Sequence, residues 1–224
     1  NKHLFKPSPP IRDVKMSGMF FYRDKDNLSE IDISEDDIRR VCLNNISKLL
    51  DIKDIEIPDN VIIVHVRNGD IFNKNTHSGF VQPPMAYYKA IFEREGVTDY
   101  SKVWVLCSNE QPTNPLVEEL KKLGCILKIE NMENSINILA NAKVLISSRS
   151  SFSKYLFFLS KNADKIYAPD FMIDLGIIKG PVSDIEIFRV NLPDYINVGS
   201  WTASVQQIKL MLTYNKNKIT INEL

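Results

Sequence analysis

A run of β-branched residues at positions 61 to 66, V-I-I-V-H-V, places the strongest constraint on the fold of this chain. The run is almost continuously apolar, which is typical of a central strand covered on both faces. It ends abruptly in the polar sequence R-N-G-D at positions 67 to 70. The pattern therefore predicts a buried strand whose polar tip reaches a site at the edge of a sheet.

The polar tip carries a histidine and an arginine. His65 and Arg67 lie two residues apart, so in an extended chain they point to the same side. Gly69 permits a sharp turn before Asp70. Open α/β sheets bind ligands at the carboxyl ends of their strands, and a guanidinium suits a phosphate. A phosphate clamp is one interpretation, and an ion pair between Arg67 and Asp70 that caps the strand is an equally good alternative.

Strands and helices alternate through the rest of the chain. The sequence predicts further strands at 103–107, 125–129, 143–147, 165–168 and 182–190, and helices at 35–50, 85–95, 115–123, 135–142, 152–160 and 202–213. Alternation at these spacings predicts an α/β fold with a doubly wound, largely parallel sheet. A long polar loop at 72–84 interrupts the pattern, and it is either a lid or acceptor-binding segment or a mobile surface excursion.

A second anion-binding feature is predicted in the turn S-S-R-S-S-F-S at 147–153. This turn joins a strand to a helix, and free N–H groups at a helix amino-terminus bind anions. In a parallel sheet it opens on the same edge as the tip of the strand at 61–66. Helix capping by Ser150 and Ser151 is the simpler alternative. The sequence contains neither the G-x-x-x-x-G-K-[ST] loop of nucleoside triphosphate hydrolases nor the G-x-G-x-x-G motif of dinucleotide-binding enzymes.

Composition narrows the class of protein. The chain has 28 Lys and Arg residues and 28 Asp and Glu residues. The protein therefore has no overall positive charge that would attract nucleic acid or acidic membranes. The three cysteines show no metal-ligand spacing. The sequence has no apolar run long enough to cross a membrane, which takes about 20 residues. We expect a cytoplasmic protein, or a lumenal catalytic fragment if an amino-terminal anchor has been removed.

Taken together, the motifs resemble those of the fucosyltransferase superfamily. H-V-R-N-G-D at 65–70 resembles its H-x-R-x-G-D motif, and V-Q-P-P-M-A-Y-Y-K-A-I at 81–91 is similar to the Q-x-P-x-x-Y-Y-x-x-A-I stretch of the α-1,2-fucosyltransferase group. The segment at 138–153, which ends in S-S-F-S, resembles the second signature of that group, and Y-A-P-D-F at 167–171 resembles the segment after it. The resemblance spans residues 61 to 171.

The resemblance implies an inverting, metal-independent glycosyltransferase of the GT-B type. Residues 1–60 would form a reduced amino-terminal, acceptor-side segment, and residues 61–224 a Rossmann-like nucleotide-sugar-binding domain. The favoured donor is GDP-fucose and the acceptor is a glycan hydroxyl. Two alternatives stay open: the same fold with a UDP-sugar such as UDP-xylose, and a non-catalytic nucleotide- or carbohydrate-binding protein. The oligomeric state is not predicted.

By the same resemblance, the donor diphosphate has a defined set of contacts. Arg67 would hold the β-phosphate. His65 would contact the donor beside it and is, with Asp70, a candidate catalytic residue. Ser150, Ser151 and Phe152 would bind the diphosphate through side-chain and backbone donors. An arginine opposite a helix amino-terminus suits the negative charge of a departing nucleoside diphosphate.

Other polar residues near this edge each have two alternative roles. Asp70 would act as the general base for an acceptor hydroxyl or would orient Arg67 or His65, and orientation is favoured. Glu130 and Glu133 would reach the nucleoside, or are simply solvated surface residues. Asn68, where many fucosyltransferases have a second arginine, is a candidate contact for the nucleoside or the sugar.

Overall fold

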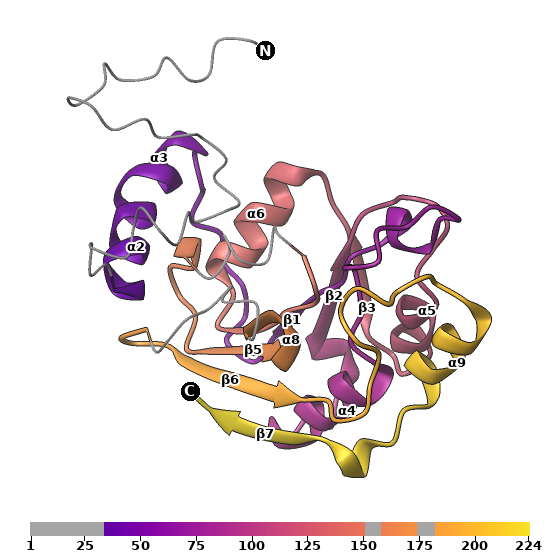
Figure 1. Ribbon diagram of the computed structural model, residues 1–224. Coiled ribbons are helices and arrows are strands. Elements are labelled where there is room, and N and C mark those ends of the chain that lie inside the picture. Colours follow the sequence, from indigo (N-terminus) through magenta and orange to yellow (C-terminus); the bar gives the residue numbers. More distant parts are fainter. Residues whose placement is uncertain (1–33, 151–157, 174–181) are drawn as a thin grey trace, which may run out of the picture. The chain divides into compact units, whose positions relative to one another are not determined.

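The central strand of the sheet, β1, runs from Ile62 to His65, within the apolar run that predicts it. The computed structural model describes residues 34–150, 158–173 and 182–224, and Figure 1 shows how their helices and strands are arranged. Ser151, Phe152 and most of the helix predicted at 152–160 lie outside the described residues. The segment from Ser34 to Leu224 belongs to one compact unit.

Seven strands form one sheet in the order β3-β2-β1-β4-β5-β6-β7. All neighbouring strands are parallel except β6 and β7. Besides β1, the strands are β2 Val103–Cys107, β3 Ile126–Ile129, β4 Val144–Ile146, β5 Lys165–Pro169, β6 Glu186–Asn191 and β7 Thr220–Glu223. The predicted α/β class with a largely parallel sheet is confirmed.

The order of the strands reverses next to β1. From β1 the chain builds outward through β2 to β3, and it then returns to place β4 on the other side of β1. Ile63 of β1 accordingly lies between Trp104 of β2 and Leu145 of β4. The first six strands thus follow the order of Rossmann-like sheets, whose ligands bind in the crevice at this reversal.

Helices cover both faces of the sheet (Figure 1). One face packs against α4 Met85–Arg94, α5 Pro115–Lys122 and α9 Val205–Thr213. The opposite face packs against α6 Met132–Asn141 and the short α8 Asp170–Ile173. The side chains of β1 alternate between these two cores, with Val64 in the first and Ile63 in the second. Burial on both faces explains why this strand is apolar without alternation.

The amino-terminal helix predicted at 35–50 is divided into three pieces. Ser34 caps it, because its hydroxyl accepts from the N–H of Asp37, whose carboxylate in turn accepts from the N–H of Ser34. The helix then passes through a π-helical turn before its last residues. The pieces are α2 Glu35–Val41, η1 Cys42–Ile46 and α3 Ser47–Leu49.

Several element boundaries differ from the sequence-based expectation. The helix expected at 135–142 begins earlier, at Met132, because Asn131 caps it through the N–H of Asn134. The strand expected at 182–190 begins at Glu186. β7 was not predicted, because its sequence T-I-N-E is too polar to suggest a strand. Three short 3-10 turns complete the description: η2 Gly69–Phe72, η3 Tyr100–Lys102 and η4 Lys216–Lys218. Among the described residues, every helix is too short or too polar to span a bilayer.

Candidate functional site

A pocket of about 630 Å³ opens at the carboxyl ends of β1, β2 and β3. Its volume lies within the range of about 300 to 1,000 Å³ that is usual for small-molecule sites. The pocket gathers most of the residues that the sequence suggests for a donor site: His65, Arg67, Asn68, Asp70, Glu130 and Ser150. It lies beside the reversal of strand order, where Rossmann-like sheets bind their ligands.

A hydrogen bond joins the two predicted halves of the site. The backbone N–H of Arg67, just after β1, donates to the hydroxyl of Ser148, just after β4, at 3.2 Å. The strands are parallel neighbours, so their ends meet at one edge. Ser150 is buried there and lines the same pocket as Arg67. The strand tip and the hydroxyl-rich turn therefore lie side by side.

The guanidinium of Arg67 is held in one orientation from two directions. Nε and Nη2 donate to the two carboxylate oxygens of Asp70, at 3.1 and 2.5 Å. Cζ lies 3.7 Å from the centre of the Phe80 ring, a cation–π contact. Asp70 is half exposed, whereas the side chain of Arg67 is 21% exposed. These contacts hold the guanidinium of Arg67 in one orientation. The ion pair with Asp70 that the sequence suggested is present.

His65 lies partly buried at the end of β1 and lines the pocket. Loss of solvation, and secondly the positive charge of Arg67, lowers the pKa of His65 from 6.5 to about 4. The imidazole is therefore uncharged at neutral pH and is a weak base. Such a group suits a hydrogen bond with a ligand better than removal of a proton from one.

Asn68 binds the backbone of a neighbouring loop. It is buried, and its Nδ2 donates to the carbonyl oxygens of Ser108 and Glu110, at 3.0 and 3.2 Å. Its Oδ1 accepts from the N–H of Asn114 at 2.6 Å, and Asn114 Nδ2 donates to the carbonyl of Arg67 at 3.0 Å. These bonds attach the tip of β1 to the loop after β2, a role the sequence did not suggest.

Gly69 fits where a larger residue would not. Its φ is +66°, and a Cβ at this position would lie 2.2 Å from Cβ of Glu110. Both the left-handed backbone and the close approach of the loop therefore require glycine. The turn lets Asp70 fold back onto Arg67. Glu110, which lies against Gly69, forms part of the wall of the pocket.

The acidic residues that the sequence suggests for nucleoside contacts differ in position. Glu130 follows β3, lines the pocket and accepts a hydrogen bond from Asn134 Nδ2 at 3.0 Å. Glu133 is exposed in the first turn of α6. Glu110, which the sequence did not single out, lines the pocket with Glu130. The pocket therefore has carboxylates at the ends of β1, β2 and β3.

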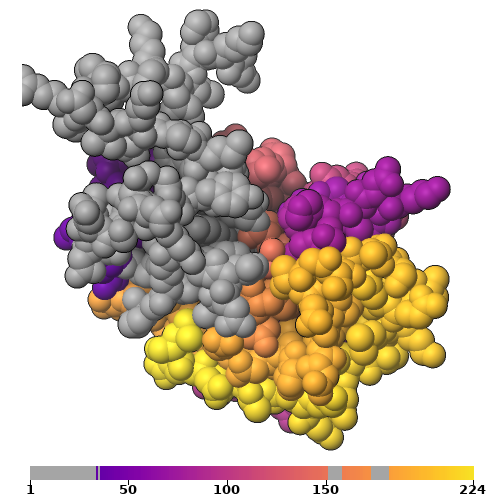
Figure 2. Space-filling view, in the orientation of Figure 1, coloured from indigo at the N-terminus to yellow at the C-terminus, as the bar shows by residue number. Residues whose placement is uncertain are grey.

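The loop at 72–84 is attached to the segment that follows β6. The carbonyl of Ser78 accepts from the N–H groups of Gly199 and Trp201, each at 3.1 Å. The indole N–H of Trp201 donates to the carbonyl of Ile71 at 2.8 Å, and the Tyr195 hydroxyl donates to the carbonyl of Gln82 at 2.9 Å. In Figure 2 the two segments lie against each other on the surface. The loop thus carries Phe80 on an anchored backbone.

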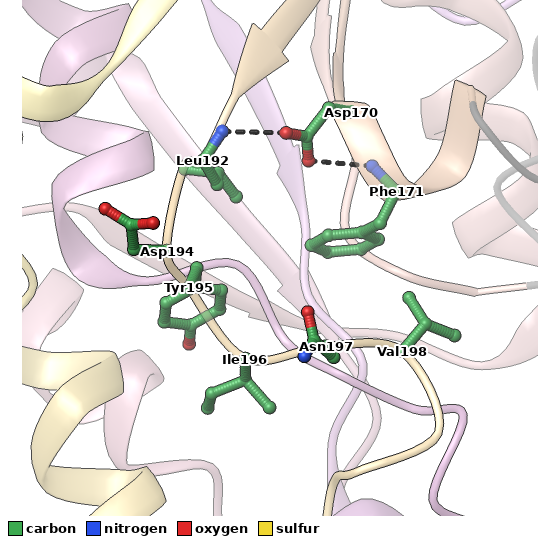
Figure 3. Close-up of a pocket in the computed structure, with 8 residues that line it drawn as sticks. All are labelled: Asp170, Phe171, Leu192, Asp194, Tyr195, Ile196, Asn197 and Val198. Atoms are coloured by element: carbon green, nitrogen blue, oxygen red, sulfur yellow. Dashed lines mark hydrogen bonds between the residues drawn. The ribbon is translucent and has the colours of Figure 1, made fainter.

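A second, smaller pocket of about 310 Å³ lies beyond the ends of β5 and β6 (Figure 3). The carboxylate of Asp170 there accepts from the backbone N–H groups of Phe171 and Leu192, at 2.7 and 2.8 Å. The aromatic rings of Phe171 and Tyr195 also line this pocket. Because both of its oxygens already accept backbone hydrogen bonds, Asp170 chiefly joins the ends of the two strands.

No three His, Cys, Asp or Glu side chains of the described segments come together as a metal site would require. Comparisons with protein-family models, with curated proteins and with solved structures find no match to this chain. The arrangement itself offers an oriented arginine, an uncharged histidine and a buried serine around one pocket. This set can bind a phosphate and stabilise negative charge that develops on it.

Proposed function

We propose that this protein is an inverting, metal-independent glycosyltransferase of the GT-B type that transfers a sugar from a nucleotide-sugar donor, with GDP-fucose favoured, to a glycan hydroxyl. One observation carries the proposal: Arg67 and Ser150, from two motifs that resemble fucosyltransferase signatures, line one pocket at the reversal of strand order. Such crevices bind nucleotides in Rossmann-like folds. Ser151 and Phe152, proposed as further diphosphate contacts, lie outside the described residues.

The proposed reaction is a direct displacement at the anomeric carbon. The acceptor oxygen forms a bond to that carbon as the bond to the diphosphate oxygen breaks, and the bonding electrons leave with the nucleoside diphosphate. Arg67 stabilises the charge that develops on the departing phosphate, a task that preorganised donors perform well. The acceptor proton passes to a base. The two hydrogen bonds between Arg67 and Asp70 favour orientation of the arginine as the role of Asp70.

The carboxylates of the pocket support a guanine nucleotide. Glu130 and Glu110 both line it. The Watson–Crick edge of guanine presents two adjacent N–H donors, which one carboxylate can accept together. Uracil presents a single N–H donor between two carbonyl oxygens, and a carboxylate would repel those oxygens. Glu130 is therefore proposed to contact the base or ribose of GDP, and the UDP-sugar alternative is less well supported.

A non-catalytic nucleotide-binding protein is the second candidate. It is favoured by the state of the two residues proposed for catalysis, because Asp70 is bound to Arg67 and His65 has a low pKa. Neither group is thus set up to remove a proton at neutral pH. Under this alternative the phosphate site binds the nucleotide, but no sugar is transferred.

Calorimetric titration with GDP, UDP, GDP-fucose and UDP-xylose, each with and without a chelator, tests the proposal. We expect chelator-insensitive binding of GDP over UDP, and release of GDP from GDP-fucose. Arg67→Gln should weaken GDP binding by about ten- to a hundredfold, the worth of hydrogen bonds to a charged group. Arg94→Gln is the matched control. Arg94 also lies over an aromatic ring, 4.5 Å from the centre of Phe188, but it is not among the residues that line the pocket. Tight GDP binding without transfer would favour the second candidate, and no nucleotide binding would refute both.

A further inference from the structure

Arg149 is a charged residue with no counter-charge in the described part of the molecule. It follows β4, between Ser148 and Ser150, and it is half-buried. Its Nη1 is fully buried and has no hydrogen-bond partner among the described residues. A buried polar atom of this kind is rare in folded proteins, and a charged one is costly unless something pairs with it.

Other arginines of the described segments have partners. Arg67 pairs with Asp70, and Arg40 pairs with Asp37. Nη2 of Arg39 donates to the carbonyl of Ser160 at 2.9 Å. Arg39 Nε is also buried without a partner, but that arginine keeps its hydrogen bond through Nη2. Arg149 forms no ion pair with any described residue.

Arg149 and Arg67 lie against adjacent residues of the same loop. A Cβ placed on Gly79 would lie 3.7 Å from Nη2 of Arg149, and the ring of Phe80 lies 3.7 Å from Cζ of Arg67. The two guanidinium groups are close enough that burial and, secondly, the charge of Arg67 lower the pKa of Arg149. Two like charges held near one another are unfavourable unless an anion lies between them.

The charge balance identifies which arginine is free to bind an anion. The carboxylate of Asp70 offsets the charge of Arg67, so the pair contributes little net charge. Arg149 therefore carries the net positive charge at the end of β4. Two guanidinium groups that lie against the adjacent residues Gly79 and Phe80 suit a terminal phosphate that accepts hydrogen bonds from both.

We propose that Arg149 is a second cation beside the donor site and binds, together with Arg67, the terminal phosphate of a nucleoside diphosphate. The inference deepens the proposed function and rests on it. The anion supplies the partner that the buried Nη1 lacks. It also neutralises the repulsion between the two arginines when the site is occupied.

Two substitutions of Arg149 test the inference by calorimetry with GDP, GMP and inorganic pyrophosphate. Arg149→Gln should weaken GDP and pyrophosphate by about ten- to a hundredfold and change GMP by less than about threefold. Arg149→Met should do the same. Because it removes an unpaired charge, it should also leave the ligand-free melting temperature equal to or above that of the wild type. Arg40→Gln, which removes an exposed charge from an ion pair, should leave all three affinities unchanged.

The outcomes separate the inference from the proposed function. If the wild type binds GDP and Arg149→Gln binds it with the same affinity, the inference is overturned and the proposed function stands. Equal loss of GMP and GDP, or a lower melting temperature in Arg149→Met, would show a structural role and overturn it too. Arg149-dependent binding of pyrophosphate without any nucleotide binding would keep the anion site and overturn the glycosyltransferase. No binding of any of the three ligands would overturn both.

Discussion

Arg67 donates from Nε and Nη2 to both carboxylate oxygens of Asp70, three residues further along the chain, at 3.1 and 2.5 Å. Gly69 makes this pairing possible, because its left-handed backbone turns the chain between the two residues. The pair is partly exposed, and ion pairs of this kind contribute only about 0 to 1 kcal/mol to stability. Its main effect is on the direction of the guanidinium.

Asp70→Asn should therefore change binding and not stability. We expect a melting temperature close to that of the wild type. GDP should bind severalfold more tightly, because a negative charge next to the phosphate site is removed. If Asp70 orients Arg67, the transfer rate should fall less than about tenfold. A fall of a hundredfold or more, the usual worth of general base catalysis, would instead identify Asp70 as the base.

Gly69→Ala should disrupt the tip of β1. The new Cβ would lie 2.2 Å from Cβ of Glu110, so one of the two segments must move. Gly96→Ala is the control, because Gly96 has a similar φ of +65° and nothing within 4 Å of the added atom. Gly96→Ala should cost about 1 kcal/mol, from backbone strain alone. Urea denaturation should show a clearly larger loss for Gly69→Ala, and adding Glu110→Gly should restore part of it. Equal losses would refute the clash.

Two adjacent buried tyrosines should respond oppositely to loss of their hydroxyls. The Tyr87 hydroxyl lies 2.9 Å from the carbonyl oxygen of Ser147, just after β4, and 3.1 Å from that of Tyr167, within β5. The Tyr88 hydroxyl is buried and has no hydrogen-bond partner among the described residues. Tyr87→Phe should cost about 1 to 3 kcal/mol of unfolding free energy, whereas Tyr88→Phe should be neutral or stabilising. Chemical denaturation of the two variants measures this difference.

Mild acid should destabilise the protein through His65. Burial and the charge of Arg67 lower its pKa from 6.5 in the unfolded chain to about 4 in the folded one. Between these values the unfolded state binds more protons, so stability is complete above pH 6.5 and falls as the pH drops towards 4. The total loss is about 3 kcal/mol. Wild type and His65→Gln, denatured with urea at several pH values, should differ in this window. Parallel curves for the two proteins would contradict the predicted shift.

Local sequence patterns predicted most of the fold. The continuous apolar run of β1 reflects burial on two faces, and it indicated a central strand without any tertiary information. Alternating strands and helices likewise predicted the parallel sheet. The patterns failed where pairing with another strand decides the structure. β7 is a polar segment that forms a strand because it pairs with β6, with Ile221 opposite Val190.

The candidate site, like the fold, could be predicted from the sequence only in part. The sequence by itself determined the residue types at the tip of β1 and in the turn after β4, and the rule that parallel strands end at one edge brought Arg67 and Ser150 together. Only the tertiary structure decided that Asn68 binds the loop after β2, that Phe80 packs against Arg67, and that Nη1 of Arg149 lacks a partner within the described segments. These contacts join segments distant in the chain, and their distances depend on how loops pack. Sequence periodicity and spacing indicate which face of a strand or helix a residue occupies, but not which residues it contacts there.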